Sequence, residues 1–222
     1  VGILHLLPFS YQELYSQKKF KTRAKNLEEV LFYGFYPPIH DRDLDPNIWY
    51  GNYVQTYIER DVRQMINVRD LGVFHRFLRL CAGRTGQLLN LSGLAEDCGI
   101  THNTAKSWIS ILEASYILFL LAPHHASFNK RLIKTPKLYF YDTGLAAWLL
   151  SVQQPDQLSI HPFKGAVFES YVISEFYKSR YNQGRTPVFY FWRDRAGNEI
   201  DLVVEQGARL SLIHISEPTR PY

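Results

Sequence analysis

The sequence predicts a mixed α and β fold whose character changes along the chain. Through residues 47–112, apolar side chains recur at the spacing of one helix face, which predicts several amphipathic helices. A helical pattern over 165–181 is then followed by two strand-like runs, 188–193 and 199–205, joined by a short polar loop. We therefore expect a helical unit followed by an α/β unit.

The composition is that of a globular protein. Among 222 residues, 46% are hydrophobic and 21% are charged, which provides a core for one large domain or two small ones. The net charge of +4 permits nucleic-acid binding without requiring it. Cys81 and Cys98 are the only cysteines, so no disulfide framework is expected and a reducing cytoplasm is predicted. No apolar run has the roughly 20 residues of a membrane helix, so no membrane partner is expected.

Both ends of the sequence suggest a piece of a longer protein. The chain begins at Val1 without a methionine, and residues 210–220 resemble the translation of a transposase-type sequencing adaptor. We therefore predict that 210–222 is an artefact with few core contacts. The alternative is a native edge strand, because apolar residues alternate through part of this tail.

The first 46 residues contain two helix starts. An apolar run over 1–7 predicts a strand stopped by Pro8. Ser10 and Glu13 have the spacing of a capping box, and Asn26 is placed to cap a second helix.

The most distinctive local pattern is a helix-turn-helix over residues 90–115. A first helix over 91–98 ends at Gly99, which suits the left-handed residue of a tight turn. Thr101 then caps a second helix, whose predicted buried face is Ala105, Trp108, Ile109 and Leu112. The outward side chains of this second helix are polar and basic, as a helix in a DNA major groove requires, and they include His102, Asn103, Lys106, Ser107 and Ser110.

Two strand patterns, 116–122 and 137–141, follow the second helix and predict a winged-helix domain over 47–150. Basic residues in or beside the predicted wing are expected to contact DNA phosphates, and they are Lys130, Arg131, Lys134 and Lys137. A structural or protein-binding winged helix fits the same pattern, so DNA is one of two partner classes.

Two acidic residues suggest a metal site in the last unit. Glu169 lies within a helix among apolar neighbours, and Asp201 lies within an apolar strand, where acids are costly unless paired or metal-bound. PD-(D/E)xK nucleases have an acid on a helix, an Asp on the second strand of a hairpin and a Glu-x-Lys on the next strand. Their carboxylates hold magnesium. We therefore predict Glu169 and Asp201 as metal-ligating and catalytic residues.

This site is predicted to be incomplete. The Glu-x-Lys strand is absent, so we expect no cleavage, although weak magnesium binding remains compatible with two carboxylates. Three alternatives stay open: Glu169 pairs with Lys164 on the helix surface, Asp201 is a solubility residue, and Glu199 faces solvent near the loop.

Several runs together resemble a prokaryotic family of AAA-type ATPases with a C-terminal domain of unknown function. The matching segments are Gly2–Ser10 with Glu13, Tyr57–Asp61, Leu94 through Ile100, Trp108–Glu113, Lys130-Arg131, Pro136–Leu145, Gly165 with Phe168-Glu169, and Glu199-Ile-Asp201. The resemblance implies that residues 1–46 are the exit of an ATPase domain with a linker. It further implies a truncated restriction-endonuclease-like α/β domain over 163–209.

The resemblance also implies a function for the intact parent, namely ATP binding with magnesium, near or on DNA, with the ATPase domain as an intramolecular partner. This chain has no Gly-x-x-x-x-Gly-Lys-Ser/Thr phosphate loop, so no cofactor is expected in it. Two alternatives remain: a metal-dependent DNA nuclease under ATPase control, and a non-enzymatic module that binds protein or nucleic acid.

Overall fold

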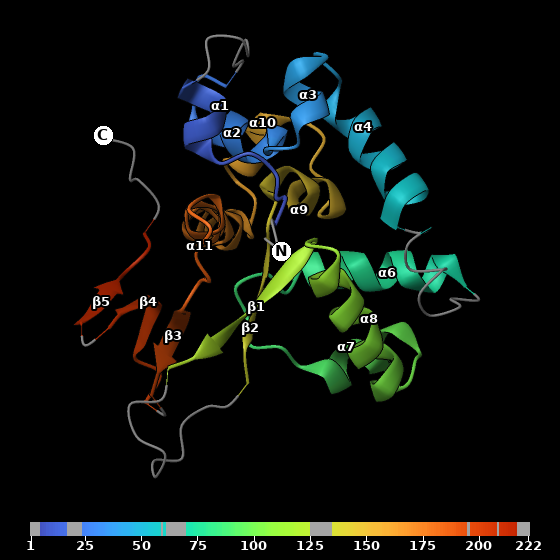
Figure 1. The fold of residues 1–222 in the computed structure, drawn as a ribbon. Coiled ribbons are helices and arrows are strands. Elements are labelled where there is room, and N and C mark those ends of the chain that lie inside the picture. Colours follow the sequence, from blue (N-terminus) through green and yellow to red (C-terminus); the bar gives the residue numbers. More distant parts are fainter. Residues whose placement is uncertain are drawn as a thin grey trace.

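The computed structural model describes residues 5–16, 24–58, 60, 70–124, 135–194, 196–207 and 209–216. Its fold is mixed α and β, as predicted, with a five-stranded mixed sheet and helices around it (Figure 1). The strands are β1 (Leu118–Pro123), β2 (Lys137–Phe140), β3 (Phe189–Arg193), β4 (Glu199–Gln206) and β5 (Arg209–Ile213).

The sheet has the order β2-β1-β3-β4-β5 and combines strands from both predicted units. β1 pairs with β2 in antiparallel fashion, while a short parallel pairing joins Ala122 to Tyr190 and Pro123 to Phe191. β3, β4 and β5 are antiparallel to one another. Because β1 and β3 are neighbours, β2 is part of the same sheet as the C-terminal hairpin.

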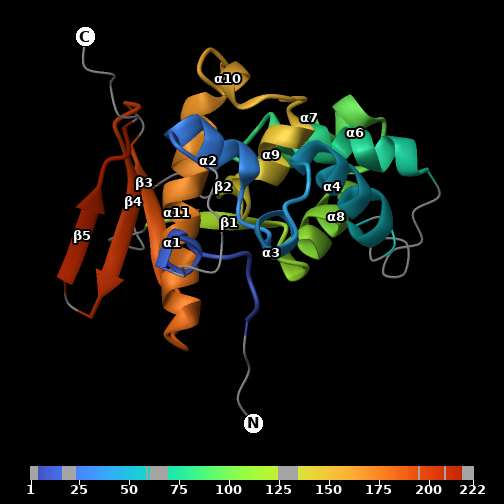
Figure 2. The same cartoon turned by 90° about the horizontal axis from the view of Figure 1, so that it is seen from above.

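The helices cover different parts of this sheet. In Figure 1, α6, α7 and α8 gather beside β1 and β2, whereas β3 to β5 extend away from them. Figure 2 shows α11 running alongside the C-terminal strands. The helices are α1 (Tyr11–Ser16), α2 (Leu27–Tyr33), α3 (Pro37–Asp41), α4 (Pro46–Tyr53), α6 (Leu71–Ala82), α7 (Leu91–Cys98), α8 (His102–Ala114), α9 (Thr143–Leu149), α10 (Pro155–Leu158) and α11 (Lys164–Asn182), with a π-helical turn, η1 (Val54–Ile58).

The predicted helix starts near the N-terminus are confirmed. The Ser10 amide donates to Glu13 Oε2 over 2.8 Å and the Glu13 amide donates to Ser10 Oγ over 3.2 Å, which is a capping box. The strand expected over 1–7 is wrong for its described part, since residues 5–7 form no strand and Leu6 is 93% exposed. Beyond it, the amide of Phe9 donates to the carbonyl oxygen of Phe35 over 2.9 Å.

The predicted pair of helices around Gly99 is also confirmed. Gly99 has a φ of +67°, so it supplies the left-handed turn between α7 and α8. The Thr101 side chain accepts a hydrogen bond from the Thr104 amide over 3.1 Å. The whole predicted inner face of α8 is buried: Ala105, Trp108, Ile109 and Leu112. Local spacing therefore predicts this part of the chain correctly.

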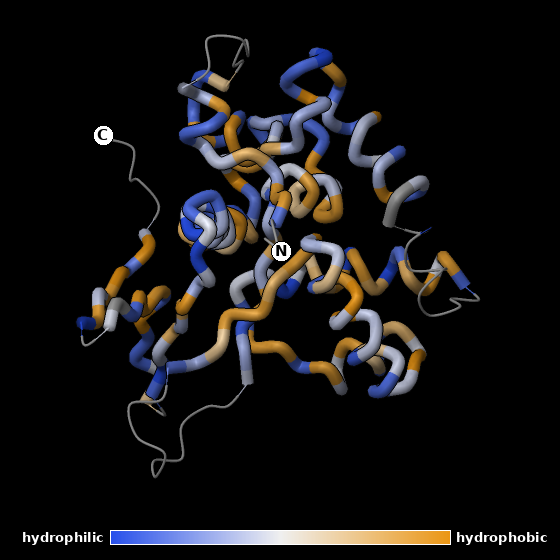
Figure 3. The backbone as a smooth tube through the Cα atoms, in the orientation of Figure 1, coloured by the Kyte–Doolittle hydropathy of each residue, from blue (hydrophilic) through white to orange (hydrophobic). Residues whose placement is uncertain are grey.

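Apolar packing holds α11 against the sheet. One core cluster combines Ile173 of α11 with Phe191 of β3 and Leu202 of β4, all completely buried. Figure 3 shows hydrophobic and hydrophilic residues interspersed along these elements. Glu169 lies four residues before Ile173 and thus on the same helix face. The packing of Ile173 therefore directs Glu169 toward the sheet.

Residues 209–213 form the edge strand β5, paired with β4 from Leu202↔Ile213 to Gln206↔Arg209. Leu210 and Leu212 remain 50% and 61% exposed. Ile213 and Ile215 pack against the cluster around Ile173. The segment thus has the geometry of the edge-strand alternative, and its adaptor origin remains a prediction.

Within the described part of the chain, no helix combines the length and apolar character needed to cross a membrane.

Candidate metal centre

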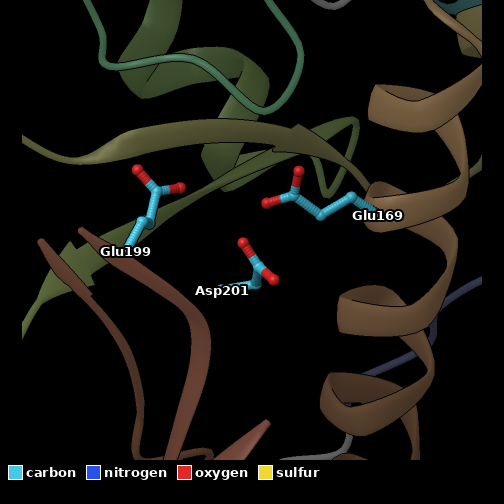
Figure 4. A group of neighbouring side chains, drawn as sticks. All are labelled: Glu169, Glu199 and Asp201. Carbon is cyan, nitrogen blue, oxygen red and sulfur yellow. The ribbon is translucent and has the colours of Figure 1, made fainter. Parts of the chain in front are cut away.

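Three carboxylates converge between α11 and β4. Glu169, Glu199 and Asp201 each offer an oxygen, and the three oxygens all lie within 4.8 Å of one another (Figure 4). Glu199 and Asp201 share a strand face because they are two residues apart on β4. The structure thus brings Glu169 and Asp201 together, as the sequence predicts, and adds Glu199.

Glu169 is held by two donors from β2. Its Oε1 accepts from Lys137 Nζ over 3.1 Å and from the hydroxyl group of Tyr139. Burial raises the pKa of Glu169, while Lys137 and Tyr139 favour its charged form and limit the rise. Burial, the Glu169 charge and the hydrogen bond to Glu169 together raise the pKa of Tyr139, which stays a neutral donor. These contacts fix the Glu169 carboxylate in the cluster.

Lys137 is the cation of the cluster. Its side chain is 4% exposed, and Nζ forms ion pairs with both Glu169 and Glu199. Tyr139 and Phe191 also surround it, with ring centroids 6.0 Å and 5.6 Å from Nζ. The expected phosphate contact of Lys137 is therefore wrong, because β2 lies inside the fold and directs this side chain to the acids.

Glu199 differs from its predicted position too. Its side chain is 22% exposed and contacts Lys137 through Oε1, while Oε2 lies 3.4 Å from Arg193 Nη1. The expectation that Glu199 faces solvent is wrong, because the hairpin presents the whole 199/201 face to α11 and β2. A third carboxylate therefore belongs to the site.

Asp201 is oriented from the residues after β5. Its Oδ2 accepts from the Ile215 amide over 2.8 Å and lies 3.4 Å from His214 Nδ1.

The suggested pairing of Glu169 with Lys164 is wrong, because Lys164 Nζ pairs with Glu28 Oε1 at 3.2 Å, whereas Glu169 pairs with Lys137.

The donor set suits a hard divalent cation. Carboxylate oxygens are the protein ligands that magnesium prefers, and it commonly uses one or two of them with several waters. Among the described residues, this is the one group of three or more His, Cys, Asp or Glu side chains close enough to share a metal ion. Glu169, Glu199 and Asp201 thus fit magnesium, with Lys137 already compensating part of their charge.

The predicted DNA-contacting residues lie elsewhere. His102, Asn103 and Lys106 are exposed on α8, and His102 and Lys106 line a groove of about 520 Å³ that extends to Leu120 of β1 and to Pro136. Lys130, Arg131 and Lys134 lie outside the described residues. The groove and the carboxylate cluster are separate sites.

Two mycobacterial proteins are similar to most of the chain. The uncharacterized protein Rv2008c of Mycobacterium tuberculosis (strain ATCC 25618 / H37Rv) and the uncharacterized protein Mb2031c of Mycobacterium bovis (strain ATCC BAA-935 / AF2122/97) are each 28% identical over 177 residues. The match covers 80% of this chain but 39% of each relative, so the chain spans about two fifths of their length. No solved structure matches the chain significantly.

Two family models also match, and the candidate site uses residues from both. The model described as a domain of unknown function, DUF4143, matches residues 164–218, which contain the three carboxylates. The model described as a domain of unknown function, DUF8612, matches residues 24–156, which contain Lys137 and Tyr139. Since the second match covers more than half of the sequence, the chain belongs to the DUF8612 family.

Proposed function

We propose that this chain is the DNA-associated C-terminal part of an ATP-binding protein of the AAA type, and that its carboxylate cluster holds a divalent cation for phosphodiester chemistry in the whole protein. The convergence of Glu169, Glu199 and Asp201 is the observation that carries the proposal. The ATPase assignment is supported by the family resemblance and by relatives much longer than the chain.

The residues divide the work of such a site. The three carboxylates would hold magnesium, which supplies Lewis-acid polarisation of a phosphate and activation of water when bound. Tyr139 orients Glu169 by donating a hydrogen bond from its hydroxyl group, and the Ile215 amide orients Asp201 by donating one to its carboxylate. Such contacts fix ligand geometry before the ion arrives, which strengthens binding. Lys137 reduces the repulsion among the acids.

A binding role without chemistry is the second candidate. It is favoured by the exposed polar face of α8, where His102, Asn103 and Lys106 point away from the core. In a winged-helix arrangement this face would enter a DNA groove, and basic residues of the 130–134 segment would contact phosphates. The two candidates are compatible, since the cluster and the α8 face are different surfaces.

Calorimetric titration of the purified chain with Mg²⁺ and Mn²⁺ tests the metal proposal. We expect saturable binding that Asp201→Asn abolishes. Glu96→Gln is the matched control, because Glu96 is an exposed acid on α7 outside the cluster, and it should bind ions as the unmodified chain does. Equal binding by Asp201→Asn and the unmodified chain would contradict a metal site at the carboxylate cluster.

A further inference from the structure

We infer that the Lys137 ammonium permanently occupies one cation position of the carboxylate cluster, so that the cluster accepts one divalent ion fewer than its three acids would hold without this lysine. The inference rests on the proposed metal function for its biological meaning. It concerns the number of ions, which nothing in the proposed function fixes.

The contacts of Lys137 are those of a bound ion rather than of a surface lysine. Nζ lies 3.1 Å from Glu169 Oε1 and is also paired with Glu199 Oε1. Only 4% of the side chain is exposed, so the ammonium has exchanged most of its water for carboxylate oxygens. Moving it out would leave two partly buried carboxylates without their main counter-charge.

The backbone holds Lys137 in this place from both sides. Lys137 opposes Leu121 in the β1–β2 ladder and Leu88 in an isolated bridge on its other side. Pairing at both edges fixes the Cα of Lys137, and burial among Glu169, Glu199 and the aromatic rings restricts its side chain. The ammonium is therefore delivered by a rigid element and not by a loop.

Charge counting then limits the number of ions. Three carboxylates and one ammonium sum to two negative charges, which one divalent cation neutralises. Arg193 adds little, because it is 38% exposed at 3.4 Å from Glu199 and is screened by water. Phosphoryl-transfer sites with two metals hold them roughly 3.5–4 Å apart between shared carboxylates. The Lys137 ammonium lies against two of the three carboxylates, where a second ion would have to bind, so we expect a single-ion site.

Counting bound Mn²⁺ by calorimetry and by the electron paramagnetic resonance signal of free ion tests the inference. We expect Lys137→Met to bind one more ion per chain than the unmodified protein, and Lys137→Arg, which keeps the charge, to bind the unmodified number. Lys164→Met is the matched control, since Lys164 pairs with Glu28 outside the cluster, and it should leave the number unchanged. An equal or smaller number in Lys137→Met overturns the inference.

The outcome separates this inference from the proposed function. If the unmodified chain binds no ion and Lys137→Met binds one, the metal function fails while the inference about Lys137 holds. If the unmodified chain binds an ion and Lys137→Met binds the same number, the inference fails while the metal function holds.

A second measurement covers the case in which Lys137→Met does not fold. Crystals of the unmodified protein, soaked in saturating Mn²⁺, should keep Lys137 Nζ against Glu169 and Glu199. An anomalous manganese peak in place of the ammonium, with the lysine turned away, would overturn the inference without any variant.

Discussion

Lys137 Nζ and Glu169 Oε1, 3.1 Å apart, join the two halves of the chain through one ion pair. Lys137 lies in the segment matched by the DUF8612 model, and Glu169 lies in the segment matched by the DUF4143 model. The carboxylate cluster therefore depends on the packing of α11 against β2. Changes in either segment should affect the same site.

Lys137→Met should destabilise the fold measurably. Removing one partner of a buried pair leaves unpaired acids and typically costs about 3 kcal/mol of unfolding free energy. Saturating Mg²⁺ should recover part of the loss, because the ion supplies the missing charge. Urea denaturation with and without Mg²⁺ measures both effects. Arg84→Met, which breaks the more exposed pair with Asp97, should cost about 0.5 kcal/mol; an equal cost for the two variants would contradict the role of burial.

The stability of the chain should depend on the protonation of Glu169. Its pKa is raised by burial, so the folded state holds this proton more tightly than the unfolded state. Its contribution favours folding below the usual glutamate pKa and is lost as the pH rises through the raised value. The unfolding free energy of the unmodified chain should therefore fall relative to Glu169→Gln over this interval.

Urea denaturation of both proteins between pH 4 and pH 8 checks this dependence. Glu96→Gln is the control for a carboxylate on an exposed helix surface. An unfolding free energy of the unmodified chain that instead rises with pH relative to Glu169→Gln would mean that Lys137 and Tyr139 outweigh the burial of Glu169.

DNA binding by the α8 face should depend on Lys106. Lys106 is exposed on α8, where the proposed DNA contact would bring it near a phosphate, and each such contact adds to the salt dependence of affinity. We expect Lys106→Ala to weaken duplex binding in fluorescence anisotropy, and the further changes Lys130→Ala and Arg131→Ala to weaken it more. Lys25→Ala, an exposed lysine outside α8, is the control. Unchanged affinity in the triple variant would remove this face from the interface.

The chain as it stands should not cleave DNA. Lys137 is engaged by two carboxylates and almost fully buried, so its charge is not available to a scissile phosphate. Without the free lysine of the nuclease layout to stabilise the developing phosphate charge, we expect positioning by the metal to be insufficient. Incubation with supercoiled plasmid and Mg²⁺ should leave the plasmid intact. Nicking that disappears in Asp201→Ala would contradict this expectation.

Local patterns account for what could be predicted from the sequence. The turn at Gly99 and the cap at Thr101 are set by neighbouring residues, and both are confirmed. The approach of Glu169 to Asp201 could also be predicted, because a buried acid on a helix and another on the second strand of a hairpin fit a layout in which the two carboxylates share a cation.

The remaining members of the cluster depend on long-range pairing. From the sequence, Lys137 is predicted to be a wing residue. The pairing of β1 with β3 instead brings β2 into the same sheet as the hairpin, and this pairing is not visible in the local sequence. Glu199 is likewise predicted to be a solvent-facing acid near the loop, because the sequence does not show that α11 covers that face of β4. Neither relationship has a local signal, although a lysine inside the apolar run 137–141 already points to a buried partner.

Titration of Mg²⁺ into the unmodified chain and into Asp201→Asn tests the central claim most directly. We expect saturable binding to the unmodified chain that is lost in Asp201→Asn, with both proteins showing the same circular dichroism spectrum. Binding that persists unchanged in a folded Asp201→Asn protein, or no binding to either protein, would contradict a divalent-cation site at Glu169, Glu199 and Asp201.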